Sequence, residues 1–376
     1  MKKVRVLHLI DTLQTGGAEA VAVTLVNHLP RERFRPYLCA TRAGGPLEAT
    51  IAPDVPLLLL HRRYTLDPAA IRLASFVAQH RIDIVHAHGT SLFLARLVAL
   101  GPGGPVVLWH SHYGRFAIED QTRLPYLLAT RRIGGVIAVN RALARWVVTR
   151  LRVPLDRVWY APNPVSLEHG AELRGEVPGK PGKRIVCVAN FHPDKDHDSL
   201  IRAFSIVASI DPDAALLLVG APRAEGLEAA IRRKVDDASL TDRVSFLGQR
   251  DDVHGLLRAS DIGVLSSRSE GLSVALLEYG AAGLPVVATS VGQNADVLDL
   301  GHAGILVPPG SPEALAAALL RLLRSPEERT RYGAALRQHV EEHFGASRVA
   351  DRFAAIYEYV LDRSDSAHPP EPVEVA

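Results

Sequence analysis

The chain has 376 residues, of which 47% are hydrophobic and 22% are charged, and its formal net charge is +2. This composition excludes an intrinsically disordered, collagen-like or disulfide-rich protein, and the length predicts two globular domains. The small net charge hides an asymmetry, because residues 1–165 hold 21 Lys and Arg but 10 Asp and Glu, whereas residues 166–376 hold 22 and 31. The basic half predicts a phosphate-bearing or membrane-surface partner, although nucleic acid would match the same charge.

The first part of the chain alternates short aliphatic runs with amphipathic stretches, which is typical of βαβ units around a parallel sheet. We predict strands at residues 4–10, 37–41, 55–60, 84–87, 106–109 and 136–139. Helices are predicted between them at residues 18–29, 68–79 and 142–151. We therefore expect one doubly wound domain over residues 1–165.

The same alternation restarts after a stretch rich in Pro and Gly at residues 162–183. Strands are predicted at residues 185–189, 216–220, 244–247, 262–265, 286–288 and 305–307, and closing helices at 312–323, 326–343 and 347–361. The expected organisation is a linker at 166–183, a second doubly wound domain at 184–345, a helix at 346–363 that packs back on the first domain, and a disordered tail at 364–376.

Cys39 and Cys187 lie far apart in the sequence and form no disulfide or metal pattern, so a reducing compartment is expected. The apolar run after Lys3 is interrupted by His8 and Asp11, which argues against a signal peptide. No window reaches the ~18 consecutive apolar residues that a membrane-spanning helix needs. We therefore expect a cytoplasmic protein, either soluble or bound peripherally at the inner face of the membrane.

The strongest motif lies at residues 266–278, directly after a predicted strand. Ligands of open parallel sheets bind at the carboxyl ends of the strands, which is where Glu270 and Gly271 fall. The helix predicted at 273–280 begins there, and free amides at a helix N-terminus suit a phosphate. Glu278 follows within the helix and can accept hydrogen bonds from vicinal hydroxyls such as those of ribose. In the alternative interpretation, Glu270 caps the helix and Glu278 is a solvated surface residue.

Four segments in this region resemble the retaining glycosyltransferases of the GT-B fold, in the large group 1 family numbered four. They are FLGQRDDV at 246–253, SRSEGLSVALLE at 267–278, AAGLPVVATSVG at 281–292 and AGILVPPG at 303–310. The resemblance implies an α/β protein of two Rossmann-like, doubly wound domains that face a central cleft. It also implies an enzyme that transfers a sugar from a UDP- or GDP-sugar to a hydroxyl of a glycan or lipid-linked glycan.

The resemblance extends to the N-terminal half. Gly16 and Gly17 resemble the glycine-rich loop that lies beneath the donor diphosphate and the acceptor, although a tight turn alone would also need glycine. Histidines end two predicted strands, in His86-Ala87-His88 and in Trp109-His110-Ser111-His112. His110 matches the functional histidine of the family, and its alternative role is structural.

Lys195 matches the second residue of a basic pair that, in the family, binds the donor diphosphate. Asn190 stands where most members have arginine. The resemblance implies that Lys195 and the amides of Gly271, Leu272 and Ser273 meet the leaving phosphate.

The spacing also spells Asp-x-Asp at residues 194–196 and at residues 196–198, which is the pattern of a metal-dependent transferase. Acidic residues at a helix start need no metal, however, and we favour helix capping. The sequence therefore predicts no metal and no cofactor.

The resemblance implies retention of anomeric configuration through front-face attack, in which the departing phosphate takes the acceptor proton. Glu270 would then hold sugar hydroxyls, and Glu278 would hold the ribose. The backbone around Gln249 and Arg250 would contact the nucleotide base. A nucleotide-sugar epimerase of the same fold and a non-catalytic nucleotide-sugar-binding protein remain alternatives.

An arginine-rich segment surrounds the apolar residues 124–129 and contains Arg115, Arg123, Arg131 and Arg132. Such a segment suits an anionic membrane surface, and a lipid-linked acceptor would explain the basic half. The alternative is a solvated helix. Nucleic acid is not expected as a partner.

Overall fold

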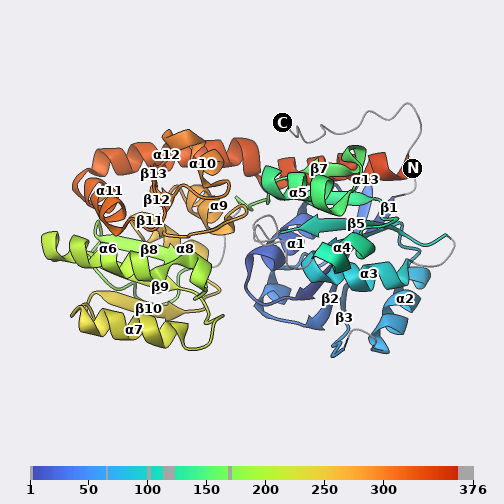
Figure 1. The fold of residues 1–376 in the computed structure, drawn as a ribbon, viewed down its shortest axis with the longest axis horizontal. Coiled ribbons are helices and arrows are strands. Elements are labelled where there is room, and N and C mark those ends of the chain that lie inside the picture. Colours follow the sequence, from blue (N-terminus) through green and yellow to red (C-terminus); the bar gives the residue numbers. More distant parts are fainter. Residues whose placement is uncertain (1–2, 65–66, 100–102, 113–122, 168–171, 363–376) are drawn as a thin grey trace. The chain divides into compact units, whose positions relative to one another are not determined.

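The computed structural model describes residues 3–64, 67–99, 103–112, 123–167 and 172–362. The chain divides into two compact units, which are Met1–Pro164 with Gly345–Ala376 (unit 1) and Val165–Phe344 (unit 2). In each unit, helices pack on both faces of a parallel sheet (Figure 1). The tail predicted at 364–376 lies outside the described residues.

The described part of unit 1 contains a seven-stranded parallel sheet in the order β3-β2-β1-β4-β5-β6-β7. The strands are β1 (Val4–Thr12), β2 (Phe34–Ala43), β3 (Leu57–Leu59), β4 (Ile84–His88), β5 (Val106–Ser111), β6 (Gly135–Ala138) and β7 (Val158–Tyr160). Sequence analysis missed β7, which is three residues long and follows η5 directly. The strand order reverses direction at β1, so the topological switch point lies between β1 and β4.

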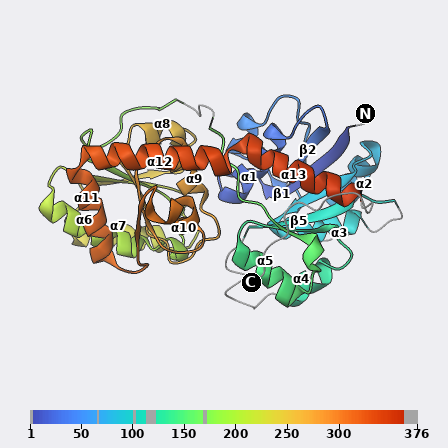
Figure 2. The same cartoon turned by 90° about the horizontal axis from the view of Figure 1, so that it is seen from above.

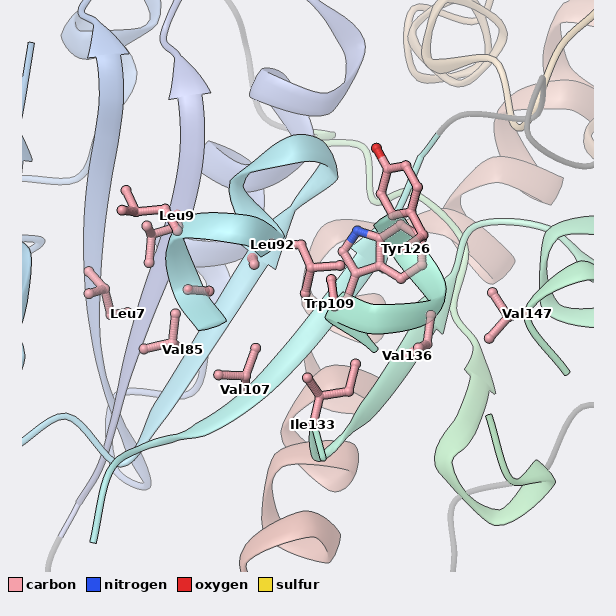
Figure 3. Close-up of a cluster of buried hydrophobic side chains, with 14 of the residues drawn as sticks. Leu7, Leu9, Val85, Leu92, Val107, Trp109, Tyr126, Ile133, Val136 and Val147 are labelled. Carbon is pink, nitrogen blue, oxygen red and sulfur yellow. The ribbon is translucent and has the colours of Figure 1, made fainter. Parts of the chain in front are cut away.

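Four helices of unit 1 cover one face of this sheet. Leu7, Val85, Val107 and Trp109 point into that layer, and Trp109 stacks on Tyr126 at 5.1 Å between ring centroids (Figure 3). The helices are α2 (Ala69–Gln79), α3 (Leu92–Val98), α4 (Arg123–Ala129) and α5 (Arg141–Leu151). Because side chains alternate along a strand, the neighbouring residues His8, His86 and His110 face the other side.

The opposite face of the sheet is covered by α1 (Gly17–His28) and α13 (Ala346–Leu361), which lie side by side (Figure 2). Val349, Phe353 and Tyr357 recur every four residues and form the buried stripe of α13. The helix is also joined to β2, because the Arg33 guanidinium donates to Glu358 at 3.1 Å. The C-terminal helix therefore completes unit 1.

The described part of unit 2 contains a six-stranded parallel sheet in the order β10-β9-β8-β11-β12-β13. The strands are β8 (Arg184–Val188), β9 (Ala215–Val219), β10 (Val244–Gly248), β11 (Ile262–Leu265), β12 (Val286–Thr289) and β13 (Ile305–Val307). Each overlaps a predicted strand, because strands buried on both faces form continuous apolar runs. The switch point of this sheet lies between β8 and β11.

Helices cover both faces of the second sheet. One face packs against α6 (His197–Ile210), α7 (Leu227–Asp237) and α11 (Pro312–Arg324). The other packs against α8 (Val253–Arg258), α9 (Val274–Ala281), α10 (Asn294–Val297) and α12 (Pro326–Phe344).

Short 3-10 turns occur in both units. They are η1 (Pro46–Thr50), η2 (Gly89–Ser91) and η5 (Leu155–Arg157) in unit 1, and η6 (Pro193–Lys195) and η7 (Asp299–Gly301) in unit 2.

Residues 172–183, in the stretch predicted as a linker, bond to unit 2. The Arg174 amide donates to Asp252 at 2.7 Å, and the Gly182 amide donates to Asp261 at 2.8 Å. Among the described residues, no helix combines the length and the hydropathy needed to cross a membrane. Cys39 and Cys187 are buried free thiols, and desolvation raises the pKa of each to about 12.

Candidate functional site

A partly buried ion pair lies at the switch point of unit 2. Lys195 ends η6, after β8, and Glu270 follows β11, the neighbouring strand. The Lys195 Nζ lies 2.5 Å from Glu270 Oε1, and Ser267 Oγ donates to the same oxygen at 2.6 Å. The Glu270 side chain is 8% exposed and that of Lys195 is 26% exposed, so the cation is the more accessible partner. Glu270 therefore holds a lysine and does not cap a helix.

The loops that carry this pair are bonded to one another. The Arg268 amide donates to Asp194 O at 2.7 Å, and Ser266 Oγ donates to Lys195 O at 2.9 Å. The loop after β12 approaches equally closely, since a Cβ on Gly292 would lie 2.3 Å from Glu270 O. Gly292 also has a φ of +55°, which disfavours other residues. The backbone around the ion pair is thus built by three loops.

The aspartates of the Asp-x-Asp pattern are engaged with the protein. Asp196 caps α6 by accepting from the Ser199 amide at 3.3 Å and Ser199 Oγ at 2.7 Å, and it accepts from Arg268 Nε at 2.8 Å. Burial alone would raise the pKa of Asp196, but the bonds from Arg268 and Ser199 outweigh it and lower the pKa. Asp198 forms an ion pair with Lys234. Asp196 therefore acts as the helix cap that sequence analysis favoured.

Glu278 lies in the second turn of α9 with its side chain half-buried. Among the described residues, nothing donates a hydrogen bond to its carboxylate, and desolvation raises its pKa to about 7. The adjacent Tyr279 anchors the helix, because its hydroxyl accepts from the Val188 amide at 2.7 Å. The Tyr279 ring also fills the space beside Gly263, where a Cβ would lie 2.7 Å from it. Glu278 is therefore an acceptor with no donor in the described part of the chain, on a helix that Tyr279 anchors.

Other predicted site residues of unit 2 follow the same two strands as Lys195 and Glu270, which are β8 and β11. Gly271, Leu272 and Ser273 lead into α9, with Ser273 as its N-cap, and no side-chain bond closes that cap. Asn190 follows β8, and its Oδ1 accepts from the Ala221 amide at 2.8 Å, which leaves its NH₂ group as the part available to a ligand.

The two residues expected near the base follow β10. Gln249 is exposed. The Arg250 guanidinium bonds to both Asp252 oxygens and to Arg174 O at 2.9 Å, and this contact lowers the pKa of Asp252 to about 2. The side chain of Arg250 is committed within unit 2, so its backbone is the part that a ligand can meet.

Gly16 and Gly17 begin α1 in unit 1, with Gly16 as the N-cap. A Cβ on Gly16 would lie 2.4 Å from Glu19 Oε2, and Glu19 also accepts from Thr12 Oγ1 at 3.3 Å. A Cβ at Gly16 would thus meet only the flexible end of the Glu19 side chain.

His110 is fully buried on the face beneath α13, and its ring centroid lies 5.2 Å from that of Phe353. It belongs to a cluster with His8, His86, His88 and His112, named here the histidine face. Sequence analysis matched His110 to the functional histidine of the family and did not single out His8. The signal for the cluster is the alternation in LHLI, VHAH and WHSH, which places each histidine on the same side of a strand.

The arginine-rich segment is described in part. Arg115 lies outside the described residues, and the side chain of Arg123 is not described. Arg131 and Arg132 are exposed after α4, and Leu124 and Leu128 on that helix are 65% and 53% exposed.

Comparison with known families adds a finding for each half. Residues 182–325 match the family described as Glycosyl transferases group 1, and residues 15–169 match Glycosyltransferase Family 4. Together these matches include most of both units.

Curated relatives carry the names of several sugar-transferring enzymes. The chain is 26% identical to the UDP-Gal:alpha-D-GlcNAc-diphosphoundecaprenol alpha-1,3-galactosyltransferase of Escherichia coli, covering 85% of this chain and 88% of the relative. It is 27% identical to the phosphatidyl-myo-inositol mannosyltransferase of Mycolicibacterium smegmatis over 94% and 89%. It is 33% identical to the N-acetyl-alpha-D-glucosaminyl L-malate synthase of Bacillus anthracis over 48% and 46%, so this match spans about half of that relative.

Solved structures share the fold. Anabaena HepE, solved with UDP and glucose, matches with a TM-score of 0.78 at 18% identity, covering 93% of this chain and 98% of that one. The sucrose-phosphate synthase of Thermosynechococcus elongatus matches with a TM-score of 0.77 at 18% identity, covering 96% and 100%. The two parallel sheets are those of the GT-B fold, as the sequence predicted.

Proposed function

The chain belongs to the group 1 glycosyltransferases of family 4, and we propose that it transfers a sugar from a UDP- or GDP-sugar to a hydroxyl of a glycan or lipid-linked glycan, with retention of configuration. The observation that carries this proposal is the ion pair of Lys195 and Glu270 at the switch point of unit 2, beside the N-terminus of α9. A cation, a carboxylate and a helix N-terminus at one strand-end edge are what a sugar diphosphate requires.

Lys195 is the group proposed to receive the leaving diphosphate. Its ammonium is partly exposed while its partner is not, so an arriving phosphate can meet it from the solvent side. The amides from Gly271 to Ser273 and the NH₂ group of Asn190 supply further donors. As the glycosidic bond to phosphate breaks, negative charge grows on the phosphate oxygen, and these preorganised groups stabilise it.

Glu270 is proposed to hold the transferred sugar. Once a phosphate competes for Lys195, the Glu270 carboxylate becomes free to accept bonds from sugar hydroxyls while Ser267 keeps it in place. The acceptor oxygen bonds to the anomeric carbon on the face that the phosphate leaves, and the acceptor proton passes to the departing phosphate oxygen. No side chain of this protein has to act as the base.

Glu278 is proposed to bind the ribose. A partly desolvated carboxylate with no donor among the described residues, and with a pKa of about 7, is stabilised by two hydroxyl donors. Vicinal ribose hydroxyls supply that pair of donors. The proposed reaction uses no divalent metal at the diphosphate, and the engagement of Asp196 and Asp198 with Arg268 and Lys234 supports this.

The acceptor is proposed to be lipid-linked, and unit 1 to contact an anionic membrane surface. Two exposed leucines of α4 lie beside exposed Arg131 and Arg132, in the half of the chain with the positive net charge. Relatives named for diphosphoundecaprenol-linked and phosphatidylinositol substrates support this class of acceptor.

The proposal is tested by incubating the purified full chain, in EDTA, with a panel of UDP- and GDP-sugars and with free or lipid-linked glycan acceptors. We expect nucleoside diphosphate release that requires an acceptor, and a product whose anomeric signal in NMR matches the donor configuration. Release without acceptor, together with an isomerised sugar, would identify an epimerase instead. Binding of donor without release under any condition would identify a non-catalytic binding protein.

A further inference from the structure

The histidine face concentrates five imidazoles on one side of the central strands of unit 1. The register pairs His8 with His86 and His88 with His110, and all four are at most 1% exposed. His112 follows β5 and is half-buried. The proposed transfer reaction calls on His110 at most, so the remaining imidazoles need another explanation.

Four hydrogen bonds join most of the cluster into a chain. His112 Nε2 lies 2.9 Å from His88 Nδ1, and His88 Nε2 lies 3.1 Å from His8 Nδ1. His8 Nε2 lies 3.3 Å from the hydroxyl of Tyr357, which lies 2.5 Å from His86 Nδ1. A neutral imidazole has one donor and one acceptor, so fixing the direction of one bond fixes the direction of all the others.

The exception is His110, which lies within this cluster and makes none of these bonds. Neither of its ring nitrogens has a partner among the described residues, although both are buried. Buried polar groups are normally satisfied, and an imidazole with two orphaned nitrogens indicates a missing ligand. The nearest ring is that of His112, with centroids 4.0 Å apart.

The nitrogens of His88, His110 and His112 converge. One ring nitrogen from each lies within 4.8 Å of the other two. Three neutral imidazoles without a carboxylate favour zinc-class ions over Mg²⁺, and three protein ligands leave a fourth position for water or another ligand. Burial lowers the pKa of all three, so the neutral, metal-binding form is present at neutral pH.

We propose that His88, His110 and His112 form a binding site for one divalent transition metal ion of the zinc class, which His112 opens toward solvent. A deeper triad of His8, His86 and His88 also converges, but its three rings are at most 1% exposed and His86 lacks a partner among the described residues only at Nε2. The outer triad breaks only the bond between His88 and His112 and gives His110 its missing partner. It is therefore the preferred site.

Metal binding would decide which atom donates and which accepts in the remaining hydrogen bonds of the histidine face. His88 would bind through Nδ1, so its Nε2–H donates to His8, and His8 donates through Nε2–H to the Tyr357 oxygen. The Tyr357 hydroxyl then donates to His86. Such outer bonds hold metal-ligating imidazoles in place, which makes Tyr357 on α13 a positioning residue for the ion.

The test is a titration of the metal-free full chain with Co²⁺, followed by visible absorption, and with Zn²⁺, followed by metal analysis after dialysis. We expect one equivalent, the absorption of a low-symmetry Co²⁺ site, and loss of binding in His110→Ala and in the half-buried, less disruptive His112→Asn. Tyr357→Phe should weaken binding by about tenfold. His343→Ala, which changes an exposed histidine of α12 beside His339, is the matched control and should bind like the native chain.

Two outcomes overturn the proposal. One is no stoichiometric metal in a natively folded chain, as judged by circular dichroism. The other is a pattern of binding that does not depend on the triad. Binding would then survive in folded His112→Asn, or it would fall equally in His343→Ala. Because the readout is metal binding, its failure leaves the proposed transfer reaction untouched.

Discussion

The two units share one architecture but use opposite chemistry near their switch points. Unit 2 places charges there, with Lys195 and Glu270 in contact at 2.5 Å and Glu278 nearby in the sequence. Unit 1 places neutral imidazoles beside its switch point, beneath α13, where burial keeps the pKa of each histidine low. The difference shows that parallel strand ends supply a position, and that the side chains decide which ligand fits it.

A charged pair is poised to exchange partners, whereas a neutral cluster is poised to receive a cation. Lys195 is neutralised by Glu270 until a stronger anion arrives. A phosphate can then replace Glu270 as the partner of Lys195. Within the described residues, the imidazoles of the histidine face bond to one another and to Tyr357 and to no carboxylate. The following variants test whether the charges of unit 2 bind the nucleotide, and how tightly the backbone is packed in each unit.

The largest effect should come from removing the cation of unit 2. Lys195→Ala is expected to lower kcat/KM by about 10²–10³, because one preorganised donor to a developing anion contributes about 2.7–4 kcal/mol. Steady-state transfer assays measure this change. Lys234→Ala, which removes a more exposed lysine paired with Asp198, is the matched control. Equal losses in both variants would contradict the assignment of Lys195.

A second comparison sets one glycine of each unit against the other. Gly292→Ala is expected to reduce the free energy of unfolding by about 1–3 kcal/mol, because φ is +55° and the new Cβ would lie 2.3 Å from Glu270 O. Gly16→Ala should change it little, since φ is −164° and only the flexible end of Glu19 must move. Denaturant unfolding measures both, and similar losses would show that Gly16 is held more tightly than its contacts suggest.

Much of this contrast could be predicted from the sequence, because it depends on local patterns. Continuous apolar runs such as ALLLV at β9 predicted the strands, the strand-end rule drew attention to Glu270, and the family resemblance drew attention to Lys195. Their contact depends on β8 and β11 being neighbours, which the order of the strands along the chain does not state.

Other features could not be predicted, because they depend on distant pairings. The bond between His86 and Tyr357 joins residues 271 positions apart. Sequence analysis expected the last helix to pack on the first domain, but it could not say which residue of that helix meets His86. The commitment of Arg250 to Asp252 depends on a loop conformation that no periodicity encodes. The pattern of histidines along three strands was visible, but only the sheet register shows that they share one face.

The third effect concerns the anion of the pair. Glu270→Gln keeps the shape of the side chain but removes the charge that holds Lys195. We expect UDP or GDP to bind about tenfold tighter, which corresponds to about 1.4 kcal/mol, while sugar transfer falls. Calorimetry of the nucleoside diphosphate measures the gain.

Glu228→Gln, in an exposed pair with Arg232, controls for loss of one negative charge from unit 2. Weaker nucleotide binding in Glu270→Gln would show instead that the carboxylate contacts the nucleotide directly.

The smallest expected effect is a pH dependence of nucleotide binding through Glu278. Desolvation raises the pKa of this carboxyl to about 7 in the free protein, so it is largely protonated below pH 6 and ionised above pH 8. Ribose hydroxyls donate best to the ionised form, so binding lowers the pKa and releases a proton. Affinity should therefore rise with pH, by about threefold between pH 6.5 and 7.5. The nucleotide's own phosphate titrates in the same range, so the native chain is compared with Glu278→Gln through the ratio of their Kd values. Glu278→Gln should bind the nucleotide more weakly, and its Kd should lack the pH dependence that Glu278 causes. A ratio that does not change with pH would separate Glu278 from the ribose.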